Sequence, residues 1–140
     1  MVKSFIIVGI NSFLGQEIKN LLLKKKCLVI SCGRNPKDDI YLDLEVENSL
    51  KLKKNFDVEG IFHCASSFGK DDVQGTKINE KVNTSSAFQI EELAKKTKAK
   101  KLVYAGTISS NKSERTISSY GLSKKRGEEL LENLLTKSNI

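Results

Sequence analysis

A tyrosine and a lysine stand four residues apart in the segment Tyr120-Gly121-Leu122-Ser123-Lys124. Residues at this spacing share one face of a helix, so the phenol and the ammonium would project together. A nearby positive charge favours a phenolate and lowers the pKa of a tyrosine toward values useful for proton transfer near neutral pH. The pair therefore predicts proton-transfer chemistry. A solvated helix face is the alternative interpretation of the same spacing.

A second candidate site is the turn Gly9-Ile10-Asn11-Ser12-Phe13-Leu14-Gly15. In a dinucleotide fold the first glycine makes a tight turn, the middle one admits the pyrophosphate, and the third lets helix and strand pack closely. Gly9 and Gly15 take the outer positions, and Ser12 takes the middle one, where its hydroxyl can donate to a phosphate. The positive end of a following helix would hold that phosphate. A glycine-rich turn without a ligand is the alternative.

Both candidates need a scaffold, and the apolar pattern predicts strands that alternate with helices. Phe5-Ile6-Ile7-Val8 is a continuous apolar run, typical of a strand buried on both faces. Such alternation is typical of a parallel sheet with right-handed crossovers. We predict an α/β fold: a three-layer, Rossmann-like, doubly wound parallel sheet of about five strands in the order 3-2-1-4-5. The predicted strands are 5–8, 27–32, 40–43, 61–65 and 101–105, and the helices start near 14 and cover 46–52, 77–96 and 118–136.

Length and composition bound the rest. The chain has 140 residues, enough for one domain over residues 1–140, with 39% hydrophobic residues and a net charge of +7. Short lysine runs without interleaved aromatic residues favour solvated helix faces over nucleic-acid binding. No apolar run is long enough to span a membrane, and the opening segment does not resemble a signal peptide, so we expect a cytoplasmic protein that binds neither membrane nor nucleic acid.

The three cysteines and the single histidine have no metal-binding spacing. Cys27, Cys32 and Cys64 lie in apolar stretches, where buried thiols that behave as small hydrophobic groups are the expectation. His63 ends the apolar run of a predicted strand, and we expect a ring that is packed or lies beside a cofactor rather than a catalytic one.

With these motifs in hand, the chain resembles the short-chain dehydrogenase/reductases, in particular the extended branch of NAD(P)-dependent nucleotide-sugar epimerases and dehydratases. The Gly9–Gly15 turn resembles the T-G-x-x-G-x-x-G loop of that branch, with Val8 for the threonine and Ser12 for the middle glycine. Asp43-Leu44 resembles the pair that contacts adenine, and His63-Cys64-Ala65-Ser66 resembles the H-x-A-A segment beside the cofactor. Asn83 matches the structural asparagine of an N-x-x-G-T motif.

The resemblance implies a catalytic set of Tyr120, Lys124 and Thr107, in which Thr107 orients the substrate oxygen and Lys124 also holds the cofactor ribose. Thr107 precedes Tyr120 by only 13 residues, so Ser109 or Ser110 is an alternative source of the hydroxyl. The resemblance also implies a set of cofactor-binding residues: Gly9, Asn11, Ser12, Phe13, Leu14, Gly15, Arg34, Asp43, Leu44, Cys64, Ala65 and Lys124.

The implied activity is that of an epimerase, a dehydratase or a reductase, with a small-molecule substrate such as a nucleotide sugar. The family's last parallel strands and its C-terminal substrate-binding region would follow Ile140, so we expect them to be absent from this chain. A truncated, non-catalytic dinucleotide-binding module is therefore the alternative function. A flavodoxin-like or response-regulator domain would share the alternating pattern but explains neither motif.

Two further expectations concern the cofactor and association. The end of the second predicted strand, Ser31-Cys32-Gly33-Arg34, offers no carboxylate for the ribose 2′-OH of NAD, and its arginine suits the 2′-phosphate of NADP. We therefore predict NADP as the preferred cofactor, with NAD possible. An unprotected sheet edge at Leu102-Val103-Tyr104, or the apolar face of the last helix, predicts self-association.

Overall fold

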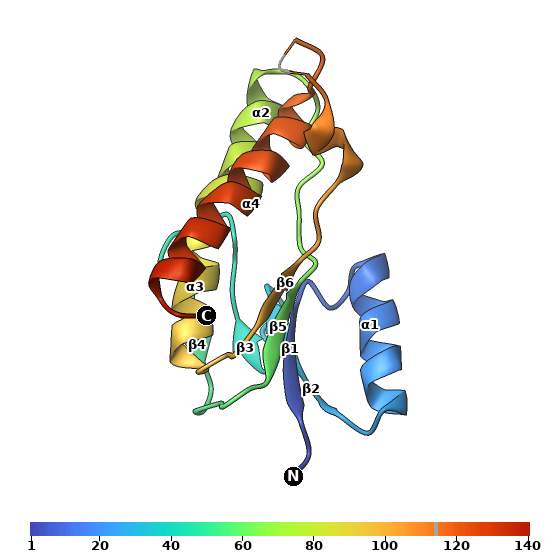
Figure 1. Ribbon diagram of the computed structural model, residues 1–140, viewed down its shortest axis with the longest axis vertical. Helices are drawn as coiled ribbons and strands as arrows, with labels where there is room; N and C mark the ends of the chain where they lie inside the picture. The colour runs from blue at the N-terminus through green and yellow to red at the C-terminus, as the bar shows by residue number, and fades with distance from the viewer. Residues whose placement is uncertain (114) are drawn as a thin grey trace.

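The computed structural model describes residues 1–113 and 115–140, which form one six-stranded sheet in the order β4-β3-β2-β1-β5-β6 (Figure 1). All neighbouring strands are parallel except β3 and β4, which are antiparallel. The predicted α/β, Rossmann-like class is thus confirmed, and the predicted order holds for the five parallel strands. The strands are β1 (Ser4–Val8), β2 (Leu28–Gly33), β3 (Ile40–Tyr41), β4 (Lys51–Leu52), β5 (Gly60–His63) and β6 (Leu102–Tyr104).

Strand β4 is an addition at the outer edge, and the helix predicted over 46–52 is wrong. Residues 44–48 form turns, and Asn48 has a positive φ of 56°, a conformation that interrupts a right-handed helix. The Ser49 hydroxyl accepts from the Asp43 backbone N–H and donates to the Asp43 carbonyl. These side-chain bonds compete with helical bonding and fold the segment back.

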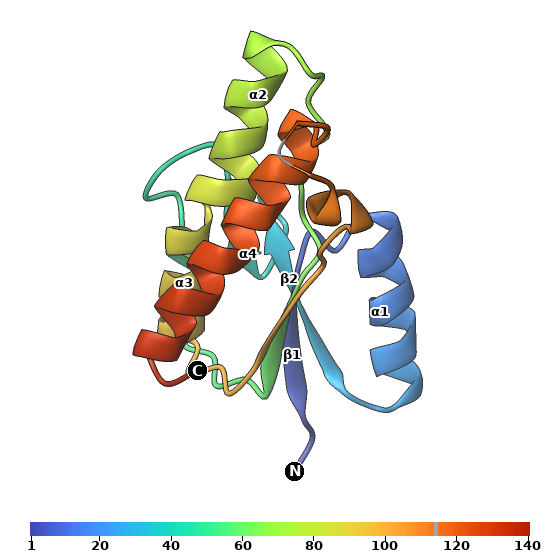
Figure 2. The same cartoon turned by 45° about the horizontal axis from the view of Figure 1, so that its top comes forward.

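Helices cover both faces of the sheet. Helix α1 (Phe13–Lys24) lies on one face, and α3 (Ala87–Lys96) and α4 (Ser119–Lys137) lie on the other, while α2 (Val73–Asn79) packs beside α4 beyond the carboxyl ends of the strands (Figures 1 and 2). The central strand β1 supplies Ile6 and Val8 to the core under α3 and α4, and Ile7 to the smaller core under α1. All three side chains are at most 1% exposed, as a strand buried on both faces requires.

The helix predicted over 77–96 is interrupted. It begins earlier as α2, because the carboxylate of Asp72 accepts from Gly75 N–H and caps the first turn. A π-helical turn, η1 (Glu80–Ser85), then separates α2 from α3. The predicted final helix agrees with α4 to within a residue, and Ser118 is its cap, since its hydroxyl accepts from Gly121 N–H at 3.1 Å.

Candidate functional site

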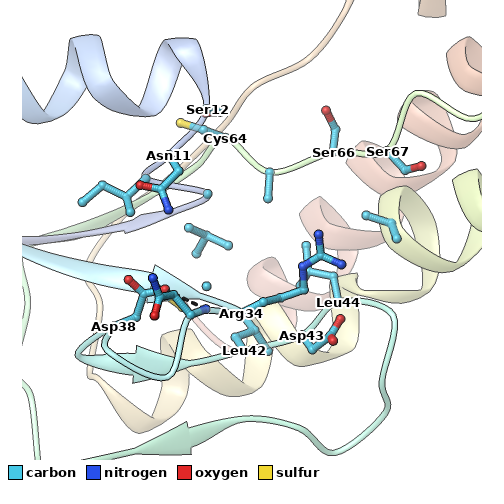
Figure 3. Close-up of a pocket in the computed structure, with 18 of the residues that line it drawn as sticks. Asn11, Ser12, Arg34, Asp38, Leu42, Asp43, Leu44, Cys64, Ser66 and Ser67 are labelled. Atoms are coloured by element: carbon cyan, nitrogen blue, oxygen red, sulfur yellow. Dashed lines mark hydrogen bonds between the residues drawn. The ribbon is translucent and has the colours of Figure 1, made fainter.

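A cavity of about 440 Å³ opens at the carboxyl ends of β1, β2 and β5 (Figure 3). This is the edge at which open parallel sheets bind ligands, beside the point where the strand order reverses around β1. Most of the predicted cofactor-binding residues line it: Gly9, Asn11, Ser12, Arg34, Asp43, Leu44, Cys64 and Ala65.

The Gly9 turn joins β1 to α1 beneath this cavity. Gly9 has a φ of +80°, and a Cβ there would lie 2.8 Å from the Ala65 backbone nitrogen. A Cβ on Gly15 would overlap the Gly9 carbonyl oxygen. A side chain is therefore excluded at both outer positions, which leaves an open turn at the N-terminus of α1, where backbone N–H groups and the helix dipole favour an anion.

Ser12 caps α1 and does not leave its oxygen free as an acceptor. Its Oγ accepts from Gly15 N–H at 3.0 Å, while its hydroxyl hydrogen remains available to a phosphate oxygen. Asn11 also lines the cavity. Phe13 and Leu14 lie instead on the first turn of α1 with 86% and 45% of their surface exposed, outside the cavity lining.

At the end of β2 the structure adds two carboxylates that the local sequence did not suggest. The Arg34 guanidinium donates to the Glu45 carboxylate at 3.2 Å, and both side chains line the cavity. Asp38, which is 8% exposed, accepts from Asn35 N–H and also lines the cavity. The only sequence signal for either was a cluster of acidic residues after the Gly33-Arg34 turn.

Asp43 and Leu44 follow β3 and form the floor of the same region. The Asp43 carboxylate accepts from Glu45 N–H at 2.9 Å, which fixes the turn. Leu44 is 8% exposed and belongs to the main core as well as to the cavity wall. On the opposite wall Cys64 and Ala65 continue from β5. Burial raises the pKa of the Cys64 thiol, and the positive charge of Lys124 opposes that rise.

Tyr120 lies in the first turn of α4 and stacks on Phe68, with ring centroids 4.6 Å apart. Phe68 belongs to the cavity lining, so this stack places the Tyr120 ring beside the cavity. Lys124 lies one turn further along α4 and is 2% exposed, with its Nζ 4.1 Å from the centre of the Tyr104 ring. Burial lowers the pKa of Lys124 to about 8. Tyr120 and Lys124 lie four residues apart on α4, but the Tyr120 ring contacts Phe68, and the Lys124 ammonium contacts the Tyr104 ring.

Thr107 ends the segment after β6 and caps the short turn η2 (Ile108–Asn111). Its Oγ1 accepts from Ser109 N–H at 3.3 Å, and the Ser110 hydroxyl donates to the Thr107 carbonyl. Turn η2 packs on the start of α4, where Gly121 has no room for a Cβ because the Ser109 carbonyl oxygen would lie 2.8 Å away. Thr107 and the alternative hydroxyls are thus near the Tyr120 turn.

His63 is a packed ring, 3% exposed, edge-on to Tyr104 with centroids 5.3 Å apart. Burial lowers the pKa of His63 to about 3, so the imidazole is neutral. Among the described residues its Nδ1 is a buried polar atom without a hydrogen-bond partner. Cys32 is buried in the core, and Cys27 and Cys64 are half-buried. In residues 1–113 and 115–140 no group of three or more potential metal ligands gathers.

The family model described as "NAD dependent epimerase/dehydratase family" matches residues 5–140. The chain belongs to this family. The match covers both candidate motifs, the Gly9 turn and the Tyr120–Lys124 pair. No curated protein sequence matches the chain significantly.

Solved structures of similar fold agree with this family. Yeast methylglyoxal/isovaleraldehyde reductase Gre2, complexed with NADPH, superposes with a TM-score of 0.77 at 17% identity over 96% of this chain and 53% of its own. MoeE5 in complex with UDP-glucose and NAD gives 0.75 at 17% identity, over 98% and 50%. dTDP-4-dehydrorhamnose reductase from Bacillus anthracis, in complex with NADP, gives 0.70 at 21% identity, over 96% and 50%. The chain thus spans about half the length of these proteins.

For an epimerase/dehydratase-family chain, two features of this site escaped sequence analysis. Glu45 engages the arginine assigned to the cofactor, and Phe68 engages the tyrosine assigned to catalysis. Each contact joins residues distant in the sequence, so no local spacing reveals it. In the described part of the chain no helix is long and apolar enough to cross a membrane.

Proposed function

We propose that this chain binds a nicotinamide dinucleotide in the cavity above β1, β2 and β5. The observation that carries the proposal is the Gly9–Gly15 turn. It brings backbone and the N-terminus of α1 to the cavity without a side chain in the way. This arrangement suits a pyrophosphate. Asp43 and Leu44 would then contact the adenine, and Cys64 and Ala65 would lie along the nicotinamide half.

The catalytic set in this proposal is Tyr120, Lys124 and Thr107. The nicotinamide, when bound, supplies the hydride acceptor or donor. Tyr120 removes a proton from a substrate hydroxyl or returns one to a carbonyl, and Thr107 orients the same oxygen by a hydrogen bond. Lys124, one helical turn after Tyr120, would favour the phenolate through its positive charge and would donate to the cofactor ribose. The buried His63 ring and the half-buried Tyr104 ring keep water away from the Lys124 ammonium, which reduces the screening of its charge.

The proposed cofactor is NADP, with NAD as the second choice. Arg34 lies at the cavity wall after β2, where an arginine accommodates a 2′-phosphate. Its present partner is Glu45, at 3.2 Å, and both side chains are well exposed to solvent. An exposed ion pair of this kind contributes little, about 0–1 kcal/mol, so a 2′-phosphate can displace the carboxylate.

The proposed substrate class is a small molecule with a secondary hydroxyl or carbonyl, such as a nucleotide sugar. MoeE5 was solved with UDP-glucose and NAD, and the neighbours include both an epimerase and reductases. We keep one alternative, a dinucleotide-binding module without turnover. The position of the Lys124 ammonium over the Tyr104 ring, outside the cavity lining, favours it.

A titration of the purified chain with NADPH and NADH, followed by nicotinamide fluorescence, tests the proposal. We expect saturable binding of both reduced cofactors, with NADPH tighter, and a loss of that preference in Arg34→Ala. Arg126→Ala, which removes another exposed, ion-paired arginine, on α4, is the matched control and should change neither affinity. A folded chain that binds neither cofactor would overturn the proposal. The chain is also assayed with a panel of nucleotide sugars and ketones. Turnover that is lost in Tyr120→Phe would rule out the alternative of a dinucleotide-binding module without catalysis.

We further propose a cytoplasmic protein that associates with itself through the β6 edge or through α4. Among the residues that the structure describes, strand β6 pairs with β5 and with no other strand, and Val103 on it is 54% exposed. An edge of this kind offers free backbone groups to another chain. Sedimentation velocity at micromolar concentration should detect dimers or larger species in the wild type and fewer in Val103→Lys. A stable monomer at all concentrations would contradict this proposal.

A further inference from the structure

Two buried asparagines hold the loop after β5 in the manner of a neighbouring strand. Asn83 Oδ1 accepts from Ser67 N–H at 2.8 Å, and its Nδ2 donates to the Ser67 carbonyl at 2.9 Å. Asn79 repeats this contact at Gly69, with distances of 2.7 and 3.1 Å. The Asn79 and Asn83 side chains are 0% and 3% exposed, so neither set of bonds has to compete with water.

The same two amides also bond to the helix that carries the catalytic pair. Asn79 Nδ2 donates to Ser119 Oγ and Asn83 Nδ2 donates to Ser123 Oγ, each at 3.0 Å. Four residues of the α-helix α4 rise about 6 Å, and two extended residues span about 6.6 Å. The amides at 79 and 83 therefore meet two pairs of positions with similar separations, 119 and 123 on α4 and 69 and 67 on the loop. Each amide links the loop to α4, one on either side of Tyr120.

Phe68 is the residue between the two held positions, and its ring stacks on Tyr120 with an interplanar angle of 25°. Phe68 itself is 75% exposed, so burial in the core does not explain its position. A stacked aromatic pair favours the stacked arrangement by roughly two- to tenfold over an unstacked one. The asparagine clamps, which are the hydrogen bonds from Asn79 to Gly69 and from Asn83 to Ser67, add to this preference because they fix the backbone on both sides of Phe68.

We propose that Phe68 and Asn79 are positioning residues for Tyr120. Asn79, with Asn83, holds the loop on α4, and Phe68 thereby keeps the phenol ring of Tyr120 in one orientation beside the cavity. The catalytic purpose of this positioning rests on the proposed function, in which Tyr120 transfers a proton. Proton transfer needs the phenol oxygen within about 0.5 Å of its productive place, which a freely rotating exposed ring would not maintain.

The test uses NMR of the chain with ¹³C-labelled tyrosine rings, with the Tyr120 signal identified from Tyr120→Phe. In the wild type the Tyr120 signal should carry the upfield shift caused by a stacked ring. Phe68→Leu and Asn79→Asp should remove most of that shift and leave the Tyr41 and Tyr104 signals in place. Phe68→Trp should restore it, and Phe88→Leu, which changes another exposed phenylalanine, should leave all three signals unchanged.

An unchanged Tyr120 signal in Phe68→Leu would overturn the inference. So would movement of all three tyrosine signals in Asn79→Asp together with no movement in Phe68→Leu, because Asn79 would then serve only the fold. Because Phe68 is exposed, Phe68→Leu should fold, and its Tyr120 signal still tests the inference if Asn79→Asp unfolds. Cofactor titration of the wild type separates this inference from the proposed function. Absence of nicotinamide binding there, with the ring shift of Tyr120 present, would count against the proposed function alone.

Discussion

Removal of the Glu45 charge should increase the preference for NADP over NAD. In the structure the Glu45 carboxylate lies 3.2 Å from the Arg34 guanidinium. A 2′-phosphate that bonds to another nitrogen of the same guanidinium would therefore lie roughly 5 to 6 Å from Glu45. At that separation in water the repulsion is about 0.7 kcal/mol per unit charge. A phosphate monoester carries about −1.5 to −2 charges, and salt at 0.15 M reduces the interaction by about half. The net penalty is about 0.5–1 kcal/mol.

Glu45→Gln should therefore bind NADPH about two- to fivefold more tightly and leave the affinity for NADH unchanged, because NADH has no 2′-phosphate. Glu47→Gln is the matched control: it removes the same charge from an exposed position in the same turn, with no contact to Arg34 among the ion pairs of the described residues. Fluorescence titration at low and high salt gives the affinities, and the gain should shrink at high salt. An equal gain in Glu47→Gln, or an equal gain for NADH, would refute the reasoning.

Three further predictions concern stability. Gly127→Ala should destabilise the fold by about 1–3 kcal/mol in urea denaturation, because its Cβ would overlap the Asn83 carbonyl oxygen, whereas Gly106→Ala meets only the flexible Glu128 side chain at 3.6 Å and should change little; equal effects would contradict the prediction. Ser118→Ala should lower the free energy of unfolding by about 1 kcal/mol, because it removes the cap of α4. The control is Ser113→Ala, which changes a serine that caps no α-helix of the described residues, and an equal effect of the two substitutions would count against the role of Ser118. Burial lowers the pKa of Lys124 from 10.5 to about 8, so between these pH values the unfolded chain binds more protons than the folded one, and the lysine destabilises the fold progressively as the pH falls from 10.5 to 8. Lys124→Met should then gain up to about 3 kcal/mol over wild type below pH 8, with the gain shrinking toward pH 10.5; a difference independent of pH would be inconsistent with a buried ammonium.

The sequence predicted the central sheet well because one physical property dominates there. The apolar run at Ile6, Ile7 and Val8 has a single solution, burial on both faces, and the Gly9 and Gly15 positions admit no side chain. Patterns of this kind are local, so they can be recognised before the fold is known. The start of α4 near residue 118 was predictable for the same reason.

The errors lie where bonds between side chain and backbone, or between distant segments, decide the structure. The segment 46–52 has an apolar spacing that suits a helix. The Ser49 hydroxyl instead bonds to the backbone of Asp43, just before this segment, and folds the chain back. Strand β4 arises from that fold-back. The pairing of Arg34 with Glu45 depends on how the end of β2 meets the turn after β3. The asparagine clamps depend on the approach of α2, η1 and α4, which no spacing in a single segment reveals.

The contact between Gly127 and the Asn83 carbonyl also limits how α4 can move. Helix α4 touches η1 there with no intervening side chain, so it cannot slide closer, and its carboxyl-terminal half is fastened by Leu131 and Leu135 in the core. On the other side of Gly127 the Asn79 and Asn83 amides bond to Ser119 and Ser123, so a tilt of α4 about this contact would have to break those hydrogen bonds. Tyr120 lies seven residues before Gly127, about 10 Å along the helix axis. A tilt of about 5° would displace the start of α4 by about 1 Å, which exceeds the roughly 0.5 Å that proton transfer tolerates, so the bonds at Ser119 and Ser123 guard the place of the phenol against even a small change of helix angle.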